Sequence, residues 1–228
     1  MGISQSASVP VVLSGSDRAT LVRRTYGLVF LGIIVTMAGA AVAMSQRALL
    51  VQSAQHPILG FFVFFGALFA AQRFSRTFPT NIALTLLATF IAGVWIAPLL
   101  FIMNQSQPGI VTQAALLTFA TFGGLSLFAV FSRRDFSAWG SFFFVGFLVL
   151  LLTSVLNLFF RNEVASLWLA GGTIFVFGGL LVFDTWRIVR SGQYGPDDYV
   201  PAAVNIYLDL LNLFLAIISL LGGGRRRS

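Results

Sequence analysis

Two aspartates, Asp184 and Asp209, stand inside long apolar stretches of a chain of 228 residues. The other five acidic residues lie in a polar N-terminal stretch or in short polar connections. An Asp at the centre of a membrane helix costs roughly 2.5 to 3.5 kcal/mol, so a pair without a role is unexpected. Two carboxyls that meet cannot easily both ionise, so they would share one proton. Such a pair predicts a pH switch: the shared proton keeps it closed, and loss of the proton drives the acids apart or admits a cation.

The second aspartate belongs to a polar stripe on the last apolar segment. The stripe residues recur every three or four positions, which puts them on one face of a helix. They are Asn205, Asp209, Asn212, Ala216 and Ser219. A polar stripe in a membrane helix must face protein or water rather than lipid. The sequence therefore predicts that this helix lies inside a bundle.

The first aspartate lies one helical turn before Arg187. At about 1.5 Å per residue, Asp184 is roughly 9 Å and Asp209 roughly 14 Å from the ends of the loop that joins their segments, so the side chains can meet. A structural alternative stays open, in which Asp184 reaches the membrane interface and pairs with Arg187.

Oxygen atoms near the expected acid pair indicate cation chemistry. Two carboxylates and nearby amides offer few oxygen ligands, so they would bind a cation only transiently. We predict that Asp184 and Asp209 form the proton sensor and gate, and that they are transient cation ligands. The predicted supporting lining is Asn205, Asn212 and Tyr207. We expect no catalytic residue and no cofactor.

Two arginines at the end of the second apolar segment are candidates for a latch on the acid pair. Arg73 and Arg76 are expected on the same membrane side as the acids. The alternative is that both are topology anchors bound to lipid phosphates, as is usual for arginines at segment ends.

The composition indicates an all-α integral membrane protein. Hydrophobic residues make up 57% of the chain and charged residues 9%, against about 25% charged in soluble domains. Seven segments approach the roughly 20 residues that a membrane span needs. They run over residues 26–44, 57–71, 81–103, 110–131, 136–160, 164–186 and 200–221. We expect a polar tail over 1–24, one seven-helix domain over 25–221, and a Gly/Arg tail over 222–228.

The arginines predict the orientation of the bundle. With a cytoplasmic N-terminus, nine of them fall on the cytoplasmic side, as the positive-inside rule requires. The tail Arg225–Arg227 disagrees with a seventh full crossing, so either the rule fails there or the last segment is re-entrant. We favour seven crossings, because residues 200–221 are long enough and carry a single charge.

Several classes of function are excluded by residue usage. The chain has no Cys, which rules out thiol chemistry, and one histidine, His56, which weakens any His-based metal site. All fourteen basic residues are Arg, so a retinal Schiff base, which needs Lys, is absent. The net charge of +7 does not indicate nucleic-acid binding, because the arginines lie at segment ends. An all-Arg basic set also suggests a GC-rich bacterial genome.

One run of residues resembles a known family signature. It begins at Phe183-Asp184-Thr185, passes through Asp197-Asp198-Tyr199, and ends in the run Tyr207-Leu208-Asp209-Leu210-Leu211-Asn212-Leu213-Phe214. With Arg24-Thr25-Tyr26, Gly93 and Pro98, it resembles the Bax inhibitor-1 family, also called transmembrane Bax inhibitor motif proteins. The resemblance implies six helices around a central C-terminal helix.

The same resemblance implies a pH-sensitive calcium leak. In the family a di-aspartyl pair on the last two helices senses protons, and its positions match Asp184 and Asp209. A second-helix arginine latches that pair, for which Arg73 and Arg76 are both candidates. The implied location is the bacterial cytoplasmic (inner) membrane. The runner-up function is a non-transporting modulator that restrains a membrane-bound AAA protease through the polar N-terminal tail.

An intramembrane protease is the remaining class. Two aspartates on the sixth and seventh segments are similar to the aspartyl type, but Tyr207-Leu208-Asp209 lacks the glycines of its GxGD motif. A serine site would need a histidine in the membrane, and His56 lies in a connection. We expect no enzymatic activity. The expected partners are the lipid bilayer, protons and calcium.

Overall fold

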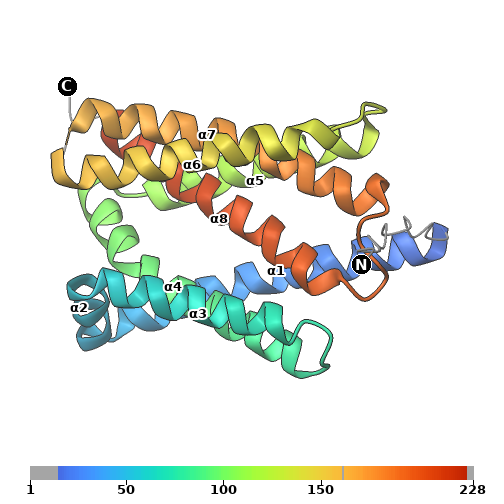
Figure 1. Cartoon of the computed structure of the whole chain (residues 1–228). Helices are drawn as coiled ribbons and strands as arrows, with labels where there is room; N and C mark the ends of the chain where they lie inside the picture. The colour runs from blue at the N-terminus through green and yellow to red at the C-terminus, as the bar shows by residue number, and fades with distance from the viewer. Residues whose placement is uncertain (1–14, 161, 225–228) are drawn as a thin grey trace, which may run out of the picture.

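The computed structural model describes residues 15–160 and 162–224, and the described chain is helical throughout its regular structure (Figure 1). The helices are α1 (Gly15–Ser45), α2 (Arg47–Gln55), α3 (Pro57–Arg73), α4 (Thr80–Ser106), α5 (Ile110–Phe131), α6 (Ser137–Phe160), α7 (Glu163–Trp186) and α8 (Tyr199–Gly224). A π-helical turn, Arg187–Ser191, continues α7.

Six of the described helices, α1 and α4 to α8, are long and apolar enough to cross a membrane. A seventh crossing requires that α2 and α3 count as one span, and these two helices are bent by 94° at their junction. The chain is therefore an integral membrane protein of the all-α class. The arrangement of six helices around a central seventh stays a prediction.

The structure extends the predicted segments at three places. Helix α1 begins at Gly15, so residues 15–24 of the expected polar tail are helical. Helix α2 is an additional element that the segment pattern did not predict. Helix α8 runs through Gly224, into the expected C-terminal tail. The predictions for residues 1–14 and for Arg225–Arg227 lie outside the described residues.

Local sequence signals set several helix ends. Asn162 caps α7, because its side-chain oxygen accepts a hydrogen bond of 3.1 Å from the amide of Ala165. Pro57 opens α3 at a position where a missing N–H costs nothing. Gly192 has φ of 69°, a left-handed conformation that ends the π-helical turn after α7.

Helices α1 and α4 pack at the closest range in the bundle that the structure describes. A Cβ added at Gly39 would meet the carbonyl of Phe90, and one added at Gly93 would meet the carbonyl of Thr36. Small residues at such crossings let helix backbones touch, which drives association in lipid. This contact builds one half of the molecule.

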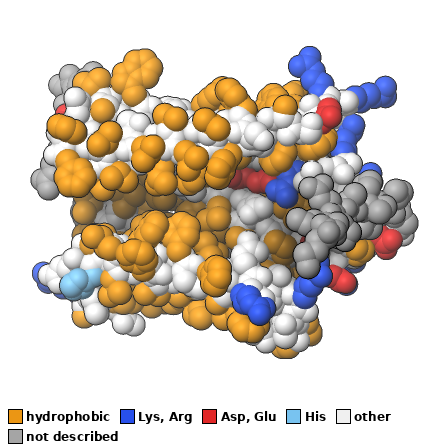
Figure 2. Space-filling model, in the orientation of Figure 1, with side chains coloured by type: hydrophobic (Ala, Val, Ile, Leu, Met, Phe, Trp, Pro, Cys, Tyr) orange, Lys and Arg blue, Asp and Glu red, His pale blue; other side chains and the backbone are white. Residues whose placement is uncertain are grey.

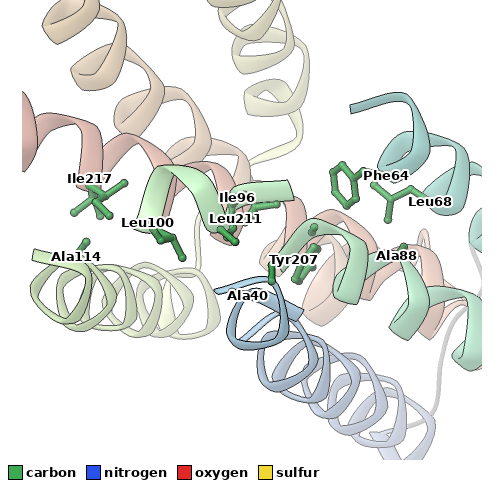
Figure 3. Close-up of a cluster of buried hydrophobic side chains, with 14 of the residues drawn as sticks. Ala40, Phe64, Leu68, Ala88, Ile96, Leu100, Ala114, Tyr207, Leu211 and Ile217 are labelled. Atoms are coloured by element: carbon green, nitrogen blue, oxygen red, sulfur yellow. The ribbon is translucent and has the colours of Figure 1, made fainter. Parts of the chain in front are cut away.

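Helix α8 joins that half to the other, which α5, α6 and α7 form. It runs diagonally between the two halves in Figure 1 and packs against α1, α3, α4, α5 and α7. Figure 3 shows one of the buried apolar clusters, to which α8 contributes Tyr207, Leu211 and Ile217. The prediction that the polar stripe turns this helix inward agrees with the burial of Asp209.

The face of the molecule shown in Figure 2 is apolar along the length of the bundle, and the basic side chains on it gather mainly at one end. Figure 1 shows that α1 begins at this end and that α8 ends at the other. The α3–α4, α5–α6 and α7–α8 connections also lie at the basic end.

Candidate proton and cation site

The structure brings the two membrane aspartates together. Asp184 comes from the last turn of α7, and Asp209 comes from the middle of α8. Their carboxyl groups lie close enough to interact directly, and both acids line one groove. Both are buried, with 7% of Asp184 and 4% of Asp209 exposed.

A hydrogen bond between two carboxyl groups needs a proton on one of them. The Nη1 of Arg187 donates to Oδ1 of Asp184 over 3.0 Å, which favours the ionised form of Asp184. No cation pairs with Asp209 among the described residues, and its buried Oδ2 has no hydrogen-bond partner there. An ionised carboxylate in that position would be costly, so the geometry favours Asp209 as the protonated member of the pair.

Arg187 is held in place by the connection that follows α7. Its Nε donates to Oε1 of Gln193 over 2.9 Å, and its guanidinium carbon lies 4.8 Å from the ring centre of Tyr194 and 5.4 Å from that of Phe183. A guanidinium over aromatic faces gains cation–π stabilisation in addition to its ion pair. The arginine also begins the π-helical turn, a distortion frequently found at functional sites.

In this structure Arg187, rather than Arg73 or Arg76, pairs with an acid of the pair. Arg76 donates to Oδ1 of Asp198 over 3.1 Å instead. Arg73 makes no ion pair with the acids within the described part of the chain. The physical reason is proximity, because Arg187 lies three residues after Asp184 on the same helical turn. The pairing is the one that the structural alternative anticipated.

Two of the three predicted lining residues lie at the site. Asn205 and Asn212 line the same groove as the acids, and Asn205 donates to the hydroxyl of Tyr194 over 3.1 Å. Tyr207 does not lie there. Its hydroxyl is 2.7 Å from Oγ1 of Thr36 on α1, because two residues before Asp209 is a different face of α8.

A groove of about 660 Å³ gives access to the acid pair. Helices α3, α6, α7 and α8 form its walls, and its aromatic lining is Phe65, Phe144, Phe147, Phe177 and Phe183. Figure 2 shows a hollow between the two halves of the molecule, with acidic and basic side chains among apolar ones. Charged groups in a groove between membrane helices are expected at an ion pathway.

No cluster of three or more His, Cys, Asp or Glu side chains occurs within the described residues. Two carboxylates with two amides are a donor set for brief cation contact.

A family model described as "Inhibitor of apoptosis-promoting Bax1" matches residues 18–226, which is most of the chain. The chain belongs to the Bax inhibitor-1 family. The match includes both acids and the whole described membrane region after Asp17.

Relatives of this Bax inhibitor-1 family protein occur in bacteria, animals and viruses. An uncharacterized protein of Campylobacter jejuni is 32% identical over 209 residues, which cover 90% of this chain and 89% of that protein. Protein lifeguard 4 of Mus musculus is 30% identical over 90% of this chain and 85% of its own length. The Golgi anti-apoptotic protein of Vaccinia virus is 30% identical with the same coverage of each chain.

Two residues that contact Arg187 were not predicted by the sequence analysis. Gln193 and Tyr194 hold Arg187 from the α7–α8 connection. A polar connection between two helices gives no periodic signal, so side chains that fold back from it are hard to recognise. The only available hint was the presence of an aromatic residue and an amide close after the first acid.

Proposed function

We propose that this protein is a pH-sensitive calcium leak gated by the Asp184–Asp209 pair. The observation that carries the proposal is a pair of neighbouring, buried carboxyl groups at the wall of a groove. Buried ionisable groups in membrane helices are costly, and ion and proton pathways are their usual role.

The proposed gate works by a change of net charge. With Asp184 ionised, Arg187 charged and Asp209 protonated, the three groups sum to zero. Loss of the proton leaves one negative charge in a groove of low dielectric constant, which both separates the acids and attracts a cation. The leak therefore opens as the pH rises.

Calcium would be coordinated only transiently along this path. Asp184, Asp209, Asn205 and Asn212 offer fewer oxygens than the six to eight that calcium prefers. Weak binding suits conduction, because an ion must leave as easily as it enters. We place the protein in the bacterial inner membrane with the basic end of the bundle in the cytoplasm, in accord with the positive-inside rule. No enzymatic step is assigned to the chain.

Calcium flux into proteoliposomes at graded pH tests the proposal. The wild-type protein is expected to show flux that rises with pH. Asp209→Asn removes the titrating proton and should make the flux independent of pH. Glu163→Gln, which changes an exposed acid in the first turn of α7, is the matched control and should keep the wild-type profile. A normal pH profile in Asp209→Asn would refute the gate.

A second series separates the observed latch from the predicted one. Arg187→Gln removes the charge that favours ionised Asp184, so the pH of half-maximal flux should move upward. Arg73→Gln and Arg76→Gln should leave that midpoint in place, because neither arginine pairs with the acids in this structure. A shift in either of the latter variants alone would restore the second-helix latch.

The runner-up function is a modulator of a membrane-bound AAA protease. Most of the tail that would make this contact lies outside the described residues. A protein that co-purifies with such a protease and carries no flux would favour it.

A further inference from the structure

A second pocket lies at the basic end of the bundle, away from the acid pair. It has a volume of about 730 Å³ and lies where α1, the α3–α4 connection and the α7–α8 connection meet. Its charged lining consists of Arg24, Arg76, Asp197 and Asp198. The four charges sum to zero, so the pocket as a whole attracts neither anions nor cations.

The charges of this pocket are arranged as two cross-links. Arg24 Nη1 lies 3.8 Å from Oδ1 of Asp197, and Arg76 Nη2 lies 3.1 Å from Oδ1 of Asp198. Both arginine side chains are at least half exposed, and the side chain of Asp197 is 84% exposed. Each guanidinium has five N–H donors, so these contacts leave most donors available.

The two acids of the pocket differ in how many further hydrogen bonds they can accept. Asp198 is already engaged at both oxygens, since its Oδ2 accepts the amide of Gly195 over 2.9 Å. Asp197 has only the long contact with Arg24 among the described residues. The pocket therefore offers free cationic donors from two arginines and a free carboxylate from Asp197.

The wall beside these charges is apolar. Leu31 and Phe78 line the same pocket, and they are 42% and 74% exposed. Leu31 lies within the membrane-spanning helix α1, where an exposed Leu faces the bilayer. A ligand that fits this pocket has an anionic group, a cationic group and an apolar part.

The pocket is also preorganised around Arg24. Its guanidinium carbon lies 5.7 Å from the ring centre of Tyr199, and the Tyr199 hydroxyl accepts a hydrogen bond of 3.1 Å from Asn81 Nδ2. Asn81 is further fixed by a bond of 2.9 Å to the carbonyl of Ser75. The arginine is thus supported by a buried amide rather than by flexible surface groups.

We propose that this pocket binds the headgroup of a phospholipid that carries a primary ammonium, the phosphatidylethanolamine class. The phosphate would accept hydrogen bonds from Arg24 and Arg76, and the ammonium would donate to Asp197. The acyl chains would lie over Leu31 and Phe78. An anionic lipid without an ammonium would offer no donor to Asp197 and would place negative charge beside it, and a quaternary choline group has no N–H to donate to Asp197.

Binding there would link three separate parts of the chain. The α7–α8 connection that supplies Asp197 also supplies Gln193 and Tyr194, which hold Arg187. Lipid retention is nevertheless independent of ion flux, so this proposal stands or falls separately from the calcium leak.

Lipid competition on the full-length purified protein tests the proposal. Native mass spectrometry of protein given equal amounts of phosphatidylethanolamine, phosphatidylcholine and phosphatidylglycerol should show preferential retention of the first. We expect a preference of about tenfold over phosphatidylcholine, the effect of one charge-assisted hydrogen bond. Equal retention of the three lipids, or a preference for phosphatidylglycerol, would overturn the assignment.

Two variants test the ammonium contact and the phosphate contact of the headgroup separately. Asp197→Asn should remove the preference over phosphatidylcholine while retaining phosphate binding. The double variant Arg24→Gln/Arg76→Gln should lose retention of all phospholipids at this pocket. The double variant Arg133→Gln/Arg134→Gln changes two exposed arginines at the same end and serves as the control. Unfolding temperatures exclude misfolding as the cause, and wild-type lipid preference in Asp197→Asn would refute the ammonium contact.

Discussion

Two buried polar clusters lie close together on α8, and they are built differently. Around Tyr207, the hydroxyl of Thr36 lies 2.7 Å from the tyrosine oxygen and also contacts the carbonyls of Gly32 and Thr89, at 2.9 Å and 3.0 Å. Thr36 needs its own proton for a carbonyl, so Tyr207 donates to it. Every polar side-chain atom of this cluster has a partner.

Around Asp209, by contrast, one polar side-chain atom has no hydrogen-bond partner among the described residues. That atom, Oδ2 of the buried carboxyl, is unpaired although Asp184 and Arg187 are adjacent. The comparison teaches how to separate structure from function in a membrane core. A satisfied cluster fixes the position of helices, whereas an unsatisfied acid is a cost that selection retains for a reason.

The largest expected effect is on the close crossing that supports the satisfied cluster. Gly93→Ala places a Cβ against the carbonyl of Thr36, which can move only if α1 moves. We expect loss of monodisperse protein, or a large fall in unfolding temperature, in size-exclusion chromatography and thermal unfolding. Gly123→Ala on α5 is the matched control, because nothing lies within 4 Å of its added Cβ. Equal stability of the two variants would contradict the described crossing.

The next effect tests which acid is ionised. Asp184→Asn removes the charged partner of Arg187 and should destabilise the protein by about 1 to 3 kcal/mol. Asp209→Asn should cost less, because its amide can donate to Asp184 as the protonated carboxyl does. Thermal unfolding at neutral pH measures both. The reverse order would place the proton on Asp184.

A smaller effect is expected from the satisfied cluster itself. Tyr207→Phe removes one neutral hydrogen bond but leaves Thr36 with its two carbonyl contacts, so we expect a loss of about 1 kcal/mol. The pH profile of calcium flux should not change, because Tyr207 lies on another face of α8 from the acids. A shifted flux profile would show that the two clusters are one functional unit.

The smallest effect concerns Tyr194 in the α7–α8 connection. Tyr194→Phe removes the bond from Asn205, at a cost of about 0.5 kcal/mol, and keeps a ring beside Arg187. Burial raises the pKa of the Tyr194 phenol above its ordinary value of 10.0. The neutral phenol therefore stabilises the folded protein below pH 10, and this stability is lost as the pH rises through the raised pKa.

Unfolding temperatures across alkaline pH check this sign. The difference between the wild type and Tyr194→Phe should narrow above pH 10, because the variant has no phenol to ionise. A constant difference over that range would mean that the phenol is not buried.

The sequence predicted the membrane segments well because a single large free-energy cost, that of exposing polar groups to lipid, decides where they lie. Unsatisfied backbone groups are costly in lipid, so long apolar runs must be helices. The limits of α5 agree with residues 110–131, and α7 begins and ends within a residue of the predicted segment. Helix α2 was not predicted, because Arg47–Gln55 is short and of mixed polarity and so gives no hydropathy signal.

The candidate site was predictable in part. Asp184 and Asp209 were identified because carboxyls among apolar residues are conspicuous, and Asn205 and Asn212 because they share a helical face with Asp209. Tyr207 was predicted beside them because it belongs to the same run of residues, although its spacing of two from Asp209 puts it on another face of α8.

The sequence by itself determined that this protein lies in a membrane, that its spans are helical, and that two acids are buried among them. These outcomes follow from the free-energy cost of placing polar groups in lipid, which depends on the sequence of each segment and not on its neighbours. Only the tertiary structure decided between Arg187 and the second-helix arginines as the partner of Asp184, and it showed that Arg76 pairs with Asp198 and that Gln193 and Tyr194 hold Arg187. These contacts depend on how the connections fold back on the helices, and such contacts leave no periodic pattern in the sequence.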